Sequence, residues 1–440
     1  MPSPPRIERA QDRRDVEAPA RARPARGLAG PWLVAASLLI LSRPASADDW
    51  PAWRGPTGQG ATRETDLPLE WGRERNVRWR TPLPGPGNST PVVAGGRVFL
   101  TQAMDGGRRR ATLCLDRKDG SVRWERVVEH LEPEPTHDTN PYCSASPVTD
   151  GERVVVVHGS AGAFAYDFEG AELWRKELGK LHHIWGNAAS PVIHGGTCYL
   201  HCGPGARTFL LALDARSGAE RWRRELPGGA EGRAGERESW TGSWSTPLVA
   251  GDGDGAFLLV SHAGRLVAHA LDSGEELWSC DGLGKLVYTT PLFDDGVAVA
   301  MSGFHGPLMA VRGGGAGDVG AARRLWRHER GPQRIGSGVI HRGRIYVLDD
   351  GGIAECLELE TGKSVWKERA GTRSWSSIVL SGDRLYALDQ KGTTHVLRAA
   401  PSFEVLARNE LGETTRASPA VSNGEVFIRT YEGLWCIGEG

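Results

Sequence analysis

Short apolar stretches alternate with polar turns through most of the chain. Residues 154–157, 257–260, 344–348 and 384–388 are rich in β-branched or aromatic side chains, and Gly, Asp or Ser bounds each of them. These stretches have no helical period of useful length, whereas runs of this size and composition are typical of β-strands. The pattern therefore predicts an all-β chain built from many short strands.

The predicted strands fall into a repeat of about 45 residues, and internal repeats of this length define whole architectures. The clearest copy begins at Ser190-Pro191, continues through Asp214 and Ser217-Gly218, and closes at Trp222. Asp followed by Ser and Gly is turn chemistry, in which Gly supplies a positive φ. Each unit is thus predicted to hold several strands, a tight turn and a last strand that carries Trp.

Alignment of the copies gives eight units, each of which starts with Ser or Thr. The starting positions are Thr90, Ser146, Ser190, Thr246, Thr290, Ser337, Ser377 and Ser418. The closing positions are Trp79, Trp124, Trp174, Trp222, Trp278, Trp326, Trp366 and, in one degenerate unit, Leu406. A buried Trp removes about 150 to 250 Å² from water, so we interpret the seven Trp as structural residues that dock one unit on the next.

Four short strands per unit in eight units predict an eight-bladed β-propeller. The strand around Trp79 has no preceding strands of its own unit, and the last unit, from Ser418 to Ile437, has no closing strand. Pairing of the N-terminal strand with the C-terminal strands closes the ring and leaves no exposed sheet edge. We therefore expect an N-terminal extension over residues 48–76 and a propeller over residues 77–440.

The first 47 residues have the pattern of a secretory signal peptide. Arg and Pro dominate residues 1–26, residues 28–41 are largely apolar, and Ala45-Ser46-Ala47 fits a cleavage site. We expect a protein located outside the cytoplasm, periplasmic or secreted, with no transmembrane segment after cleavage. Retention of residues 1–47 as a membrane anchor is the alternative that stays open. Removing its eight Arg and four acidic residues leaves 45 basic and 50 acidic residues, a net charge of about −5 that argues against nucleic-acid binding.

The single basic run, Arg108-Arg109-Arg110, lies between two predicted strands and is interpreted as a solvated hairpin tip. Seven Cys are present, an odd number. Cys114, Cys356 and Cys436 take the place of a small residue in the repeat, which predicts packed strand cysteines. Cys198 and Cys202 lie on one predicted strand about 13 Å apart, beyond the reach of a disulfide. Cys143 and Cys280 remain unassigned.

The units at 114–124 and 212–222 resemble the tryptophan-docking repeat of the pyrroloquinoline-quinone (PQQ) propellers. That family includes PQQ-dependent alcohol dehydrogenases and the outer-membrane assembly factor BamB, and the resemblance spans residues 77–437. It implies an eight-bladed propeller. For the enzymes it implies two adjacent Cys below the quinone, a calcium ion held partly by Glu and Asn, and a catalytic Asp. This chain has no Cys-Cys pair, and no such Glu, Asn and Asp set matches by motif. BamB is a lipoprotein, and no Cys lies beside the cleavage site here.

Residues ahead of each Ser-Pro position are expected to meet at one mouth of the channel, because the first strand of each blade lines it. They are unusually rich in aromatic, His, Asn and Arg side chains: Asn140, Tyr142, Cys143, His182, His183, Trp185, Asn187, Trp240, Trp244, Tyr288, Arg334, Trp375 and Arg416. Such a set is suited to stacking on a planar anion or a quinone. The alternatives are that these side chains plug the channel or form a surface for a protein partner.

The sequence favours an exported, non-catalytic propeller that acts as a docking or scaffold module for another protein or envelope component, as a monomer. One alternative is a PQQ-dependent periplasmic dehydrogenase with the quinone and calcium at the channel mouth. A second is a carbohydrate-binding propeller that uses exposed Trp. No metal site is predicted, because the adjacent His182 and His183 face opposite ways on a strand and no third ligand is evident.

Overall fold

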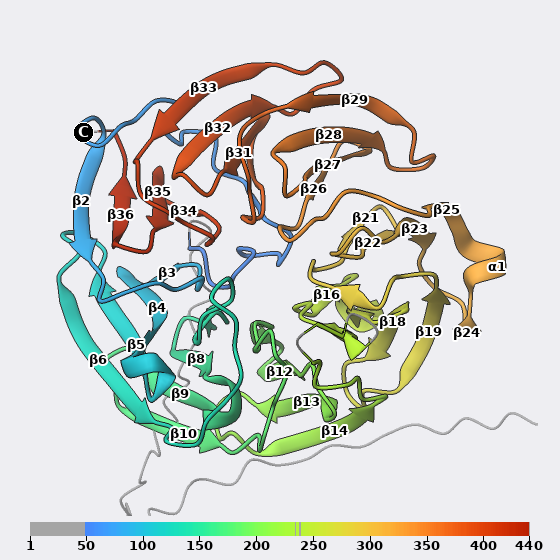
Figure 1. Ribbon diagram of the computed structural model, residues 1–440, viewed down its shortest axis with the longest axis horizontal. Helices are drawn as coiled ribbons and strands as arrows, with labels where there is room; N and C mark the ends of the chain where they lie inside the picture. Colours follow the sequence, from blue (N-terminus) through green and yellow to red (C-terminus); the bar gives the residue numbers. More distant parts are fainter. Residues whose placement is uncertain (1–48, 234, 237–238, 440) are drawn as a thin grey trace, which may run out of the picture. The chain divides into compact units, whose positions relative to one another are not determined.

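Antiparallel sheets of four strands are arranged around a central channel (Figure 1). The computed structural model describes residues 49–233, 235–236 and 239–439. The predicted signal peptide, residues 1–47, lies outside the described residues. Among the described helices none is long and apolar enough to span a membrane.

Within the described residues eight four-stranded sheets form the blades, which we number in chain order from Thr90. Blade 1 contains β3 (Val92–Ala94), β4 (Arg97–Met104), β5 (Arg109–Asp116) and β6 (Val122–Glu129). Blade 2 contains β7 (Val148–Thr149), β8 (Arg153–Val157), β9 (Ala163–Asp167) and β10 (Glu172–Lys176). Blade 3 contains β11 (Val192–His194), β12 (Thr197–Cys202), β13 (Thr208–Asp214) and β14 (Glu220–Leu226). Blade 4 contains β16 (Leu248–Ala250), β17 (Phe257–His262), β18 (Arg265–Ala270) and β19 (Glu276–Asp281).

The second half of the chain continues the pattern. Blade 5 contains β21 (Leu292–Asp294), β22 (Val297–Met301), β23 (Leu308–Arg312) and β25 (Arg324–His328). Blade 6 contains β26 (Val339–His341), β27 (Arg344–Leu348), β28 (Ile353–Glu358) and β29 (Ser364–Arg369). Blade 7 contains β30 (Val379–Ser381), β31 (Arg384–Leu388), β32 (Thr393–Arg398) and β33 (Val405–Glu410). Blade 8 contains β34 (Ala420–Ser422), β35 (Glu425–Arg429), β36 (Gly433–Ile437) and β2 (Val77–Pro82). The predicted all-β, eight-bladed propeller is confirmed.

A few short elements decorate the blades. β1 (Ala61–Thr62) joins blade 7 beside β30, β24 (Gly317–Asp318) joins blade 4 beside β19, and β15 (Gly242–Ser243) pairs with β20 (Leu286–Val287). The short helices are α1 (Gly320–Arg323), η1 (Asp105–Gly107), η2 (Gly159–Ala161) and η4 (Gly253–Gly255). In blade 8 the N-terminal strand β2 runs antiparallel to β36, with Trp79 opposite Cys436.

The repeated Trp and Gly form one interlocking contact between neighbouring blades. The indole of Trp222 in blade 3 donates a 2.9 Å hydrogen bond to the carbonyl of Leu271 in blade 4. Gly274 of the same blade-4 turn lies over this ring, and a Cβ built there would come within 2.6 Å of it. Gly274 also has a φ of +70°, so two independent constraints select glycine. Equivalent indole-to-carbonyl hydrogen bonds are made by Trp79, Trp124, Trp174, Trp326 and Trp366.

Blade 7 departs from this pattern, and its register corrects the alignment. In seven blades the closing Trp lies opposite a small residue, as Trp222 lies opposite Ala212. In blade 7 that position is Ala407, opposite Val396, so the alignment with Leu406 was wrong by one residue. Each closing strand has a β-bulge beside this position. Without a Trp to mark the position, a sequence alignment cannot tell the bulged residue from its neighbour.

The N-terminal extension supplies an indole to blade 7. Trp71 stacks on Tyr386 of β31, with ring centroids 6.2 Å apart and an interplanar angle of 11°. In blades 3 and 6 the corresponding tyrosines contact the closing Trp of their own blade. The backbone N–H of Trp71 donates a 2.9 Å hydrogen bond to Asn409 of β33. Trp71 thus brings an indole from a distant part of the chain to the blade whose closing strand has none, although its Nε1 makes no hydrogen bond to a neighbouring blade.

The Ser or Thr that opens each unit belongs to a ring of hydrogen bonds around the channel. The backbone N–H of Ser146 donates to the hydroxyl of Ser190, and the N–H of Ser418 donates to the hydroxyl of Thr90. Five further bonds of this kind join successive blades. The series lacks the link between blades 4 and 5, where the Thr290 hydroxyl is buried without a partner. The hydroxyl therefore connects blades, which explains why each unit needs Ser or Thr.

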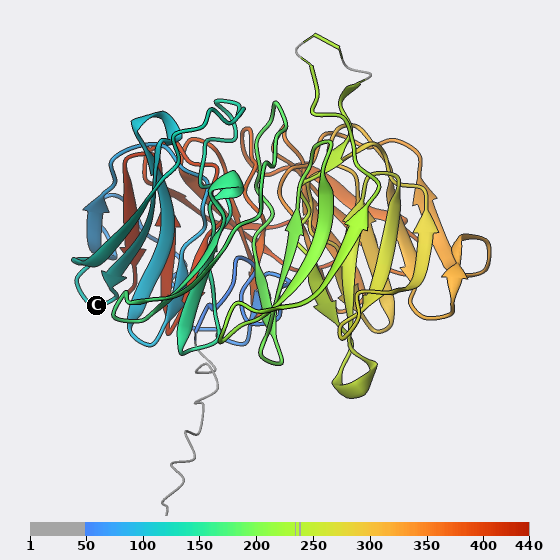
Figure 2. The ribbon, with the colours of Figure 1, turned by 90° about the horizontal axis from the view of Figure 1, so that it is seen from below.

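Residues 50–62 of the extension cross one end of the channel, seen in blue near the centre of Figure 1 and at the lower end of the blades in Figure 2. Trp50 pairs with Val93 of blade 1, and β1 pairs with β30 of blade 7. Between them the buried Arg54 donates to the carbonyls of Ile378 and Gly338. Burial lowers the pKa of Arg54 to about 9. The extension crosses this end of the channel and lines a cavity of about 440 Å³ there.

All seven cysteines lie in the described part of the chain, and all are free and buried. Burial raises the pKa of the Cys143 and Cys202 thiols to about 12 in each case. Such thiols stay protonated at physiological pH and are poor nucleophiles.

Candidate docking cup at the channel mouth

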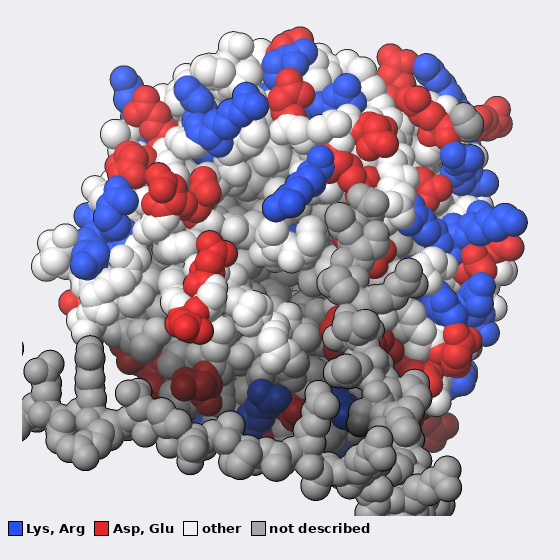
Figure 3. All heavy atoms as spheres, turned by 180° about the vertical axis from the view of Figure 1, so that it is seen from behind, with Lys and Arg blue, Asp and Glu red and all other residues white. Residues whose placement is uncertain are grey.

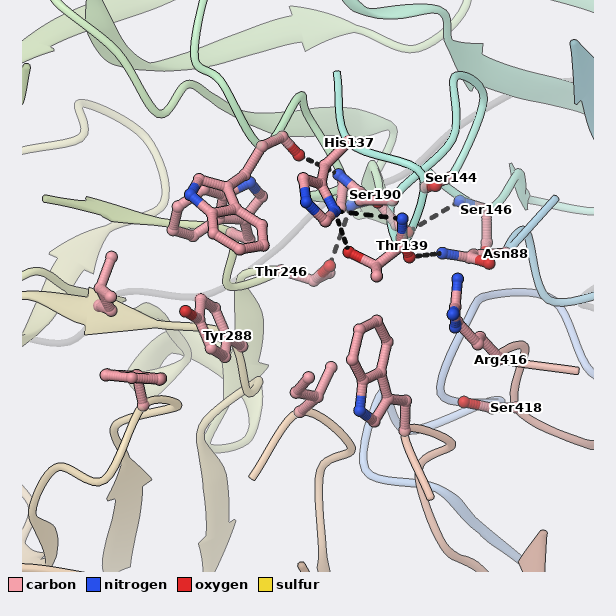
Figure 4. Close-up of a pocket in the computed structure, with 18 of the residues that line it drawn as sticks. Asn88, His137, Thr139, Ser144, Ser146, Ser190, Thr246, Tyr288, Arg416 and Ser418 are labelled. Carbon is pink, nitrogen blue, oxygen red and sulfur yellow. Dashed lines mark hydrogen bonds between the residues drawn. The ribbon is translucent and has the colours of Figure 1, made fainter. Parts of the chain in front are cut away.

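The other end of the channel opens into a cavity of about 350 Å³ (Figure 4). We call it the aromatic cup. Its base includes Trp53 of the extension, which also contributes to the cavity at the opposite end. The lining residues come from most of the blades: Trp53, Asn88, His137, Thr139, Asn140, Ser144, Ser146, Trp185, Ala188, Ser190, Trp240, Trp244, Thr246, Leu286, Tyr288, Phe304, Gln333, Ile335, Trp375, Arg416 and Ser418.

Several residues selected from the sequence meet in this cup, and others do not. Those that line it are Asn140, Trp185, Trp240, Trp244, Tyr288, Trp375 and Arg416. Those outside the lining are Tyr142, Cys143, His182, His183, Asn187 and Arg334. Arg334 pairs with Glu355 at 3.2 Å, and Asn187 donates to Glu134 at 2.9 Å. These two side chains support the wall instead of facing the cavity.

One wall of the cup is a series of aromatic contacts. Trp185 stacks on His137, with centroids 4.4 Å apart, and meets Trp240 edge-on at 5.6 Å. Farther along, Trp244 meets Tyr288 at 5.3 Å, and its indole donates a 2.8 Å hydrogen bond to the Gly186 carbonyl. Stacked and edge-on pairs each add about 0.5 to 1.5 kcal/mol to simple burial, so this wall is preformed.

Arg416 supplies the one Lys or Arg charge in the cup lining. Its guanidinium carbon lies 4.7 Å from the centroid of the Trp375 ring, a cation–π contact. Nη1 donates to the Tyr431 hydroxyl at 2.7 Å and to the Asp138 carbonyl at 3.1 Å. Nε is buried without a partner. Among the described residues no carboxylate forms an ion pair with Arg416, and the lining of the cup contains no Asp or Glu.

Opposite the aromatic wall the lining is polar. The hydroxyls of Ser146, Ser190, Thr246 and Ser418 belong to the ring described above and are already occupied by backbone N–H groups. Asn88 donates to the Thr139 carbonyl at 3.1 Å, while its side-chain oxygen is buried without a partner. The unpaired atoms of Asn88 and Arg416 are both buried, so a group that enters the cup would meet the exposed parts of these side chains instead.

The loop between blades 1 and 2, which carries His137 and Asn140, is held by a buried ion pair. Arg110 and Glu134 lie 2.7 Å apart, with side chains 2% and 3% exposed. Arg110 also packs over the ring of Tyr142. The interpretation of Arg110 as part of a solvated hairpin tip was therefore wrong. A run of three Arg looks uniformly solvent-facing in sequence, but alternate residues of β5 point to opposite faces.

Sequence reasoning missed several lining residues. His137 and Thr139 lie upstream of the stretch that we examined, although they belong to the same loop. Phe304, which is 39% exposed, lies between β22 and β23, and Trp53 comes from the extension. These residues line the cup because their loops bend over the channel, and the local sequence pattern does not predict the path of a loop.

Two buried histidines beside the cup predict a loss of stability in acid. Burial, aided by Arg110, lowers the pKa of His158 to about 3, and burial lowers that of His183 to about 4. An unfolded His titrates near 6.5, so below that pH the unfolded chain binds protons that the folded chain does not. The free energy of unfolding should be highest above about pH 7 and should fall, below the unfolded pKa of about 6.5, by up to about 1.4 kcal/mol per pH unit for each His until the folded pKa is reached.

Urea unfolding between about pH 7.5 and about pH 4.5 measures this slope. His183→Phe should reduce it, because the edge contact with Trp244 at 4.9 Å tolerates a neutral ring. His194→Gln, at an exposed position on β11, is the control and should leave it unchanged. An equal slope in wild type and His183→Phe would contradict the assignment.

The cup does not fit a PQQ–calcium pair. Its lining has no Asp or Glu, the hard oxygen ligands that calcium requires. Across the described residues no group of three or more His, Cys, Asp or Glu side chains is arranged to hold a metal ion. Arg416 is the one Lys or Arg side chain in the lining that would pair with an anionic quinone. The donor set instead suits one planar or aromatic group with a single negative charge.

Eight four-stranded blades around a channel that the N-terminal extension crosses at one end and that opens as a cup at the other define the class of this protein as a PQQ-like propeller. The family model described as "Outer membrane protein assembly factor BamB" matches residues 72–181, 106–314 and 312–402. The chain therefore belongs to the BamB family.

A curated relative and solved structures agree with this family. The outer membrane protein assembly factor BamB of Yersinia pestis is 24% identical over 272 residues, which are 59% of this chain and 60% of the relative. This chain thus matches less than two thirds of that protein's length. BamB from Moraxella catarrhalis has a TM-score of 0.59 at 17% identity, covering 81% of this chain and 95% of that one. A europium-containing methanol dehydrogenase has a TM-score of 0.66 at 12% identity, covering 88% and 90%. At these identities the two structures establish the fold alone.

Proposed function

We propose that this chain is an exported, non-catalytic propeller that docks a partner protein of the cell envelope in the aromatic cup. The observation that carries the proposal is the combination of a preformed aromatic wall with the charge of Arg416, which forms no ion pair among the described residues. Membership of a family described as an assembly factor supports a protein partner. The signal-peptide pattern of residues 1–47 supports export, to the periplasm or beyond.

The size and chemistry of the cup favour an inserted protein segment. A volume of about 350 Å³ is near the lower end of the range for small-molecule sites and accommodates a few side chains. Trp, Tyr and Arg are the residues that most often dominate binding energy at protein interfaces. An aromatic side chain next to a carboxylate on the partner would stack on Trp375 or Trp185 and pair with Arg416.

One observation favours a second function. The stacked pair of Arg416 and Trp375 is also suited to a planar anion such as a quinone, so a PQQ-dependent dehydrogenase is the second candidate function. The absence of acidic side chains from the described lining weighs against it. Carbohydrate binding by the partly buried Trp side chains of the cup is the remaining alternative. Titration of the purified protein with PQQ and calcium distinguishes a dehydrogenase from a docking module. Saturable reduction of an electron-accepting dye would overturn the docking proposal.

Photo-crosslinking tests the docking proposal directly. A photoreactive amino acid at Phe304, at the rim of the cup, should capture one discrete partner protein in intact cells. Leu277 on the outer strand of blade 4 is the matched control, because it is 40% exposed and Phe304 is 39% exposed. Arg416→Ala and Trp375→Ala should each reduce the adduct at least about tenfold, as expected for interface residues worth 2 kcal/mol or more. Their melting temperatures should change little.

Two results would contradict the proposal. The first is an equal adduct from Phe304 and Leu277, which indicates random collision. The second is a large fall in melting temperature in both Arg416→Ala and Trp375→Ala, which would show that these side chains plug the channel and stabilise the fold.

A further inference from the structure

The N-terminal extension hydrogen-bonds to the innermost strands of several blades at one repeated position. This position is the third residue after the Ser or Thr that opens each unit. Its N–H donates to the extension in blades 1, 2, 5 and 7, over distances of 2.8 to 3.0 Å. Backbone groups at this position therefore face the channel. The bonds run from Val93 to Trp50, from Thr149 to Pro51, from Phe293 to Gln59 and from Leu380 to Gly60.

Blades 3 and 4 have the same position without such a partner. Ile193 occupies it on β11 and Val249 on β16, in the antiparallel register that Val93 has on β3. Their N–H and carbonyl groups therefore face the channel, as those of Val93 do. Among the described residues, the extension makes no hydrogen bond to either of them. An unpaired strand edge of this kind is a template on which another chain segment can pair.

The free edges of β11 and β16 open into the cavity of about 440 Å³ beside the extension. Residues 51–59 form one side of this cavity, and Ile193 and Val249, both partly buried, lie on the other side. The cavity is at the end of the channel opposite the cup, on the face that Figure 3 shows. Its volume is within the range of ordinary binding sites, so a short chain segment has room beside the two edges.

The rim of this cavity is acidic. Asp252, Asp294 and Asp295 line it at the hairpins of blades 4 and 5, and all three residues are exposed. In the part of the chain that the structure describes, none of them forms an ion pair. Arg54 is the one Lys or Arg of the described lining, and it is buried against carbonyls of blades 6 and 7. Figure 3 shows acidic side chains near the middle of this face. A positively charged group is therefore the complement of the rim.

The extension shows how one segment bonds to two blades in succession. Two consecutive residues, Trp50 and Pro51, bond to the innermost strands of blades 1 and 2. The next contacts with the blades come from Arg54, and these are with blades 6 and 7. The positions that would follow in order around the ring, Ile193 and Val249, are the ones that stay free.

We propose that this cavity receives an extended, basic segment of a partner protein. The main chain of the segment pairs with the free edges at Ile193 and Val249, as Trp50 and Pro51 pair with blades 1 and 2. A Lys or Arg side chain of the segment meets the three Asp of the rim. Backbone pairing supplies affinity, and the charged contact selects the segment. This surface is separate from the aromatic cup, so the propeller holds partners at both ends of its channel.

Hydrogen exchange of the free, full chain, resolved to single residues, tests whether the two edges are open. The N–H groups of Ile193 and Val249 should exchange at least about a hundredfold faster than those of Val93 and Leu380, which bond to the extension. Equal protection at all four positions would show that the chain covers both edges itself, and it would overturn the proposal.

A random heptapeptide library tests for the occupant. It is first depleted on the double variant Asp294→Asn/Asp295→Asn and then selected on the purified full chain, so that binders of the cup are removed. The best binder, synthesised with blocked ends, should contain Lys or Arg and should bind at least about tenfold more weakly to Ile193→Pro. Proline removes the N–H that faces the cavity and no hydrogen bond of the blade. Ile340→Pro makes the same change on β26, outside the cavity lining, and is the matched control.

A series of peptides that each carry one backbone N-methyl group covers the case in which Ile193→Pro fails to fold. Methylation should weaken binding to the wild-type chain at alternate positions, because alternate N–H groups of a strand face the edge on which it pairs. Failure to enrich any peptide, unchanged affinity in a folded Ile193→Pro, or a methylation series without effect would each overturn the proposal. Loss of binding in Trp375→Ala would overturn it as well, because the peptide would then occupy the cup.

Discussion

Replacing Trp222 by alanine is expected to lower the free energy of unfolding by about 3 to 5 kcal/mol, the range for truncation of a core aromatic. The side chain is 9% exposed and contacts Tyr199 in its own blade. It also donates to Leu271 and covers Gly274 in the next blade. Its loss therefore opens a cavity across the boundary between blades 3 and 4 and removes one of the two hydrogen bonds to the Leu271 carbonyl, which the Tyr199 hydroxyl also reaches at 3.2 Å. Urea unfolding measures the change.

Trp240→Ala is the control for Trp222→Ala. Trp240 belongs to the rim of the cup and makes its indole hydrogen bond within its own loop, to Arg233. Its truncation should cost less than about 1 kcal/mol. Gly274→Ala provides a second check, because the added methyl would collide with the Trp222 ring and strain a backbone at φ +70°. Similar losses in Trp222→Ala and Trp240→Ala would contradict the docking role of the repeated Trp.

Replacing Glu134 by alanine is expected to destabilise the fold by about 3 to 5 kcal/mol, because Arg110 is left as an unpaired buried charge. Glu134 also accepts the 2.9 Å hydrogen bond from Asn187, and its backbone carbonyl accepts the Tyr142 hydroxyl. The loop that carries His137 and Asn140 loses its anchor, so capture of the partner at Phe304 should fall as well. Denaturant unfolding and the crosslinking assay measure the two effects.

A surface pair provides the control for the buried one. Glu360 accepts two hydrogen bonds from Arg312, at 2.7 and 2.8 Å, but both side chains are about half exposed. Glu360→Ala should cost less than about 1 kcal/mol. The double variant of Arg110→Met with Glu134→Leu should be more stable than Glu134→Ala alone, because it removes both charges. A double variant as unstable as the single one would show that packing, and not the unpaired charge, dominates.

The cup illustrates why site residues were only partly predictable. Trp244, Trp375 and Arg416 were found because they precede a Ser or Thr that marks the inner strand, and inner strands line the channel. His183 and Asn187 also precede such a residue, Ser190, but they turn into the wall, where His183 contacts Trp244 and Asn187 donates to Glu134. Sequence spacing places a residue near the mouth, but the side-chain direction depends on the path of each loop.

The sequence by itself determined the number of blades, the strands within them and the residues that dock them, because each blade repeats the same local pattern of apolar strands, Asp-Gly turns and Trp. Only the tertiary structure decided what lies between distant segments. It brought Trp71 of the extension onto Tyr386, beside the Trp-less strand of blade 7, and Trp53 across the channel. It also brought His201 of blade 3 to His262 and His269 of blade 4. The physical reason is that contacts within a blade, and between neighbouring blades, use equivalent positions in every unit and therefore leave a repeated sequence pattern. The contacts named here join positions that are not equivalent, so they leave no such pattern.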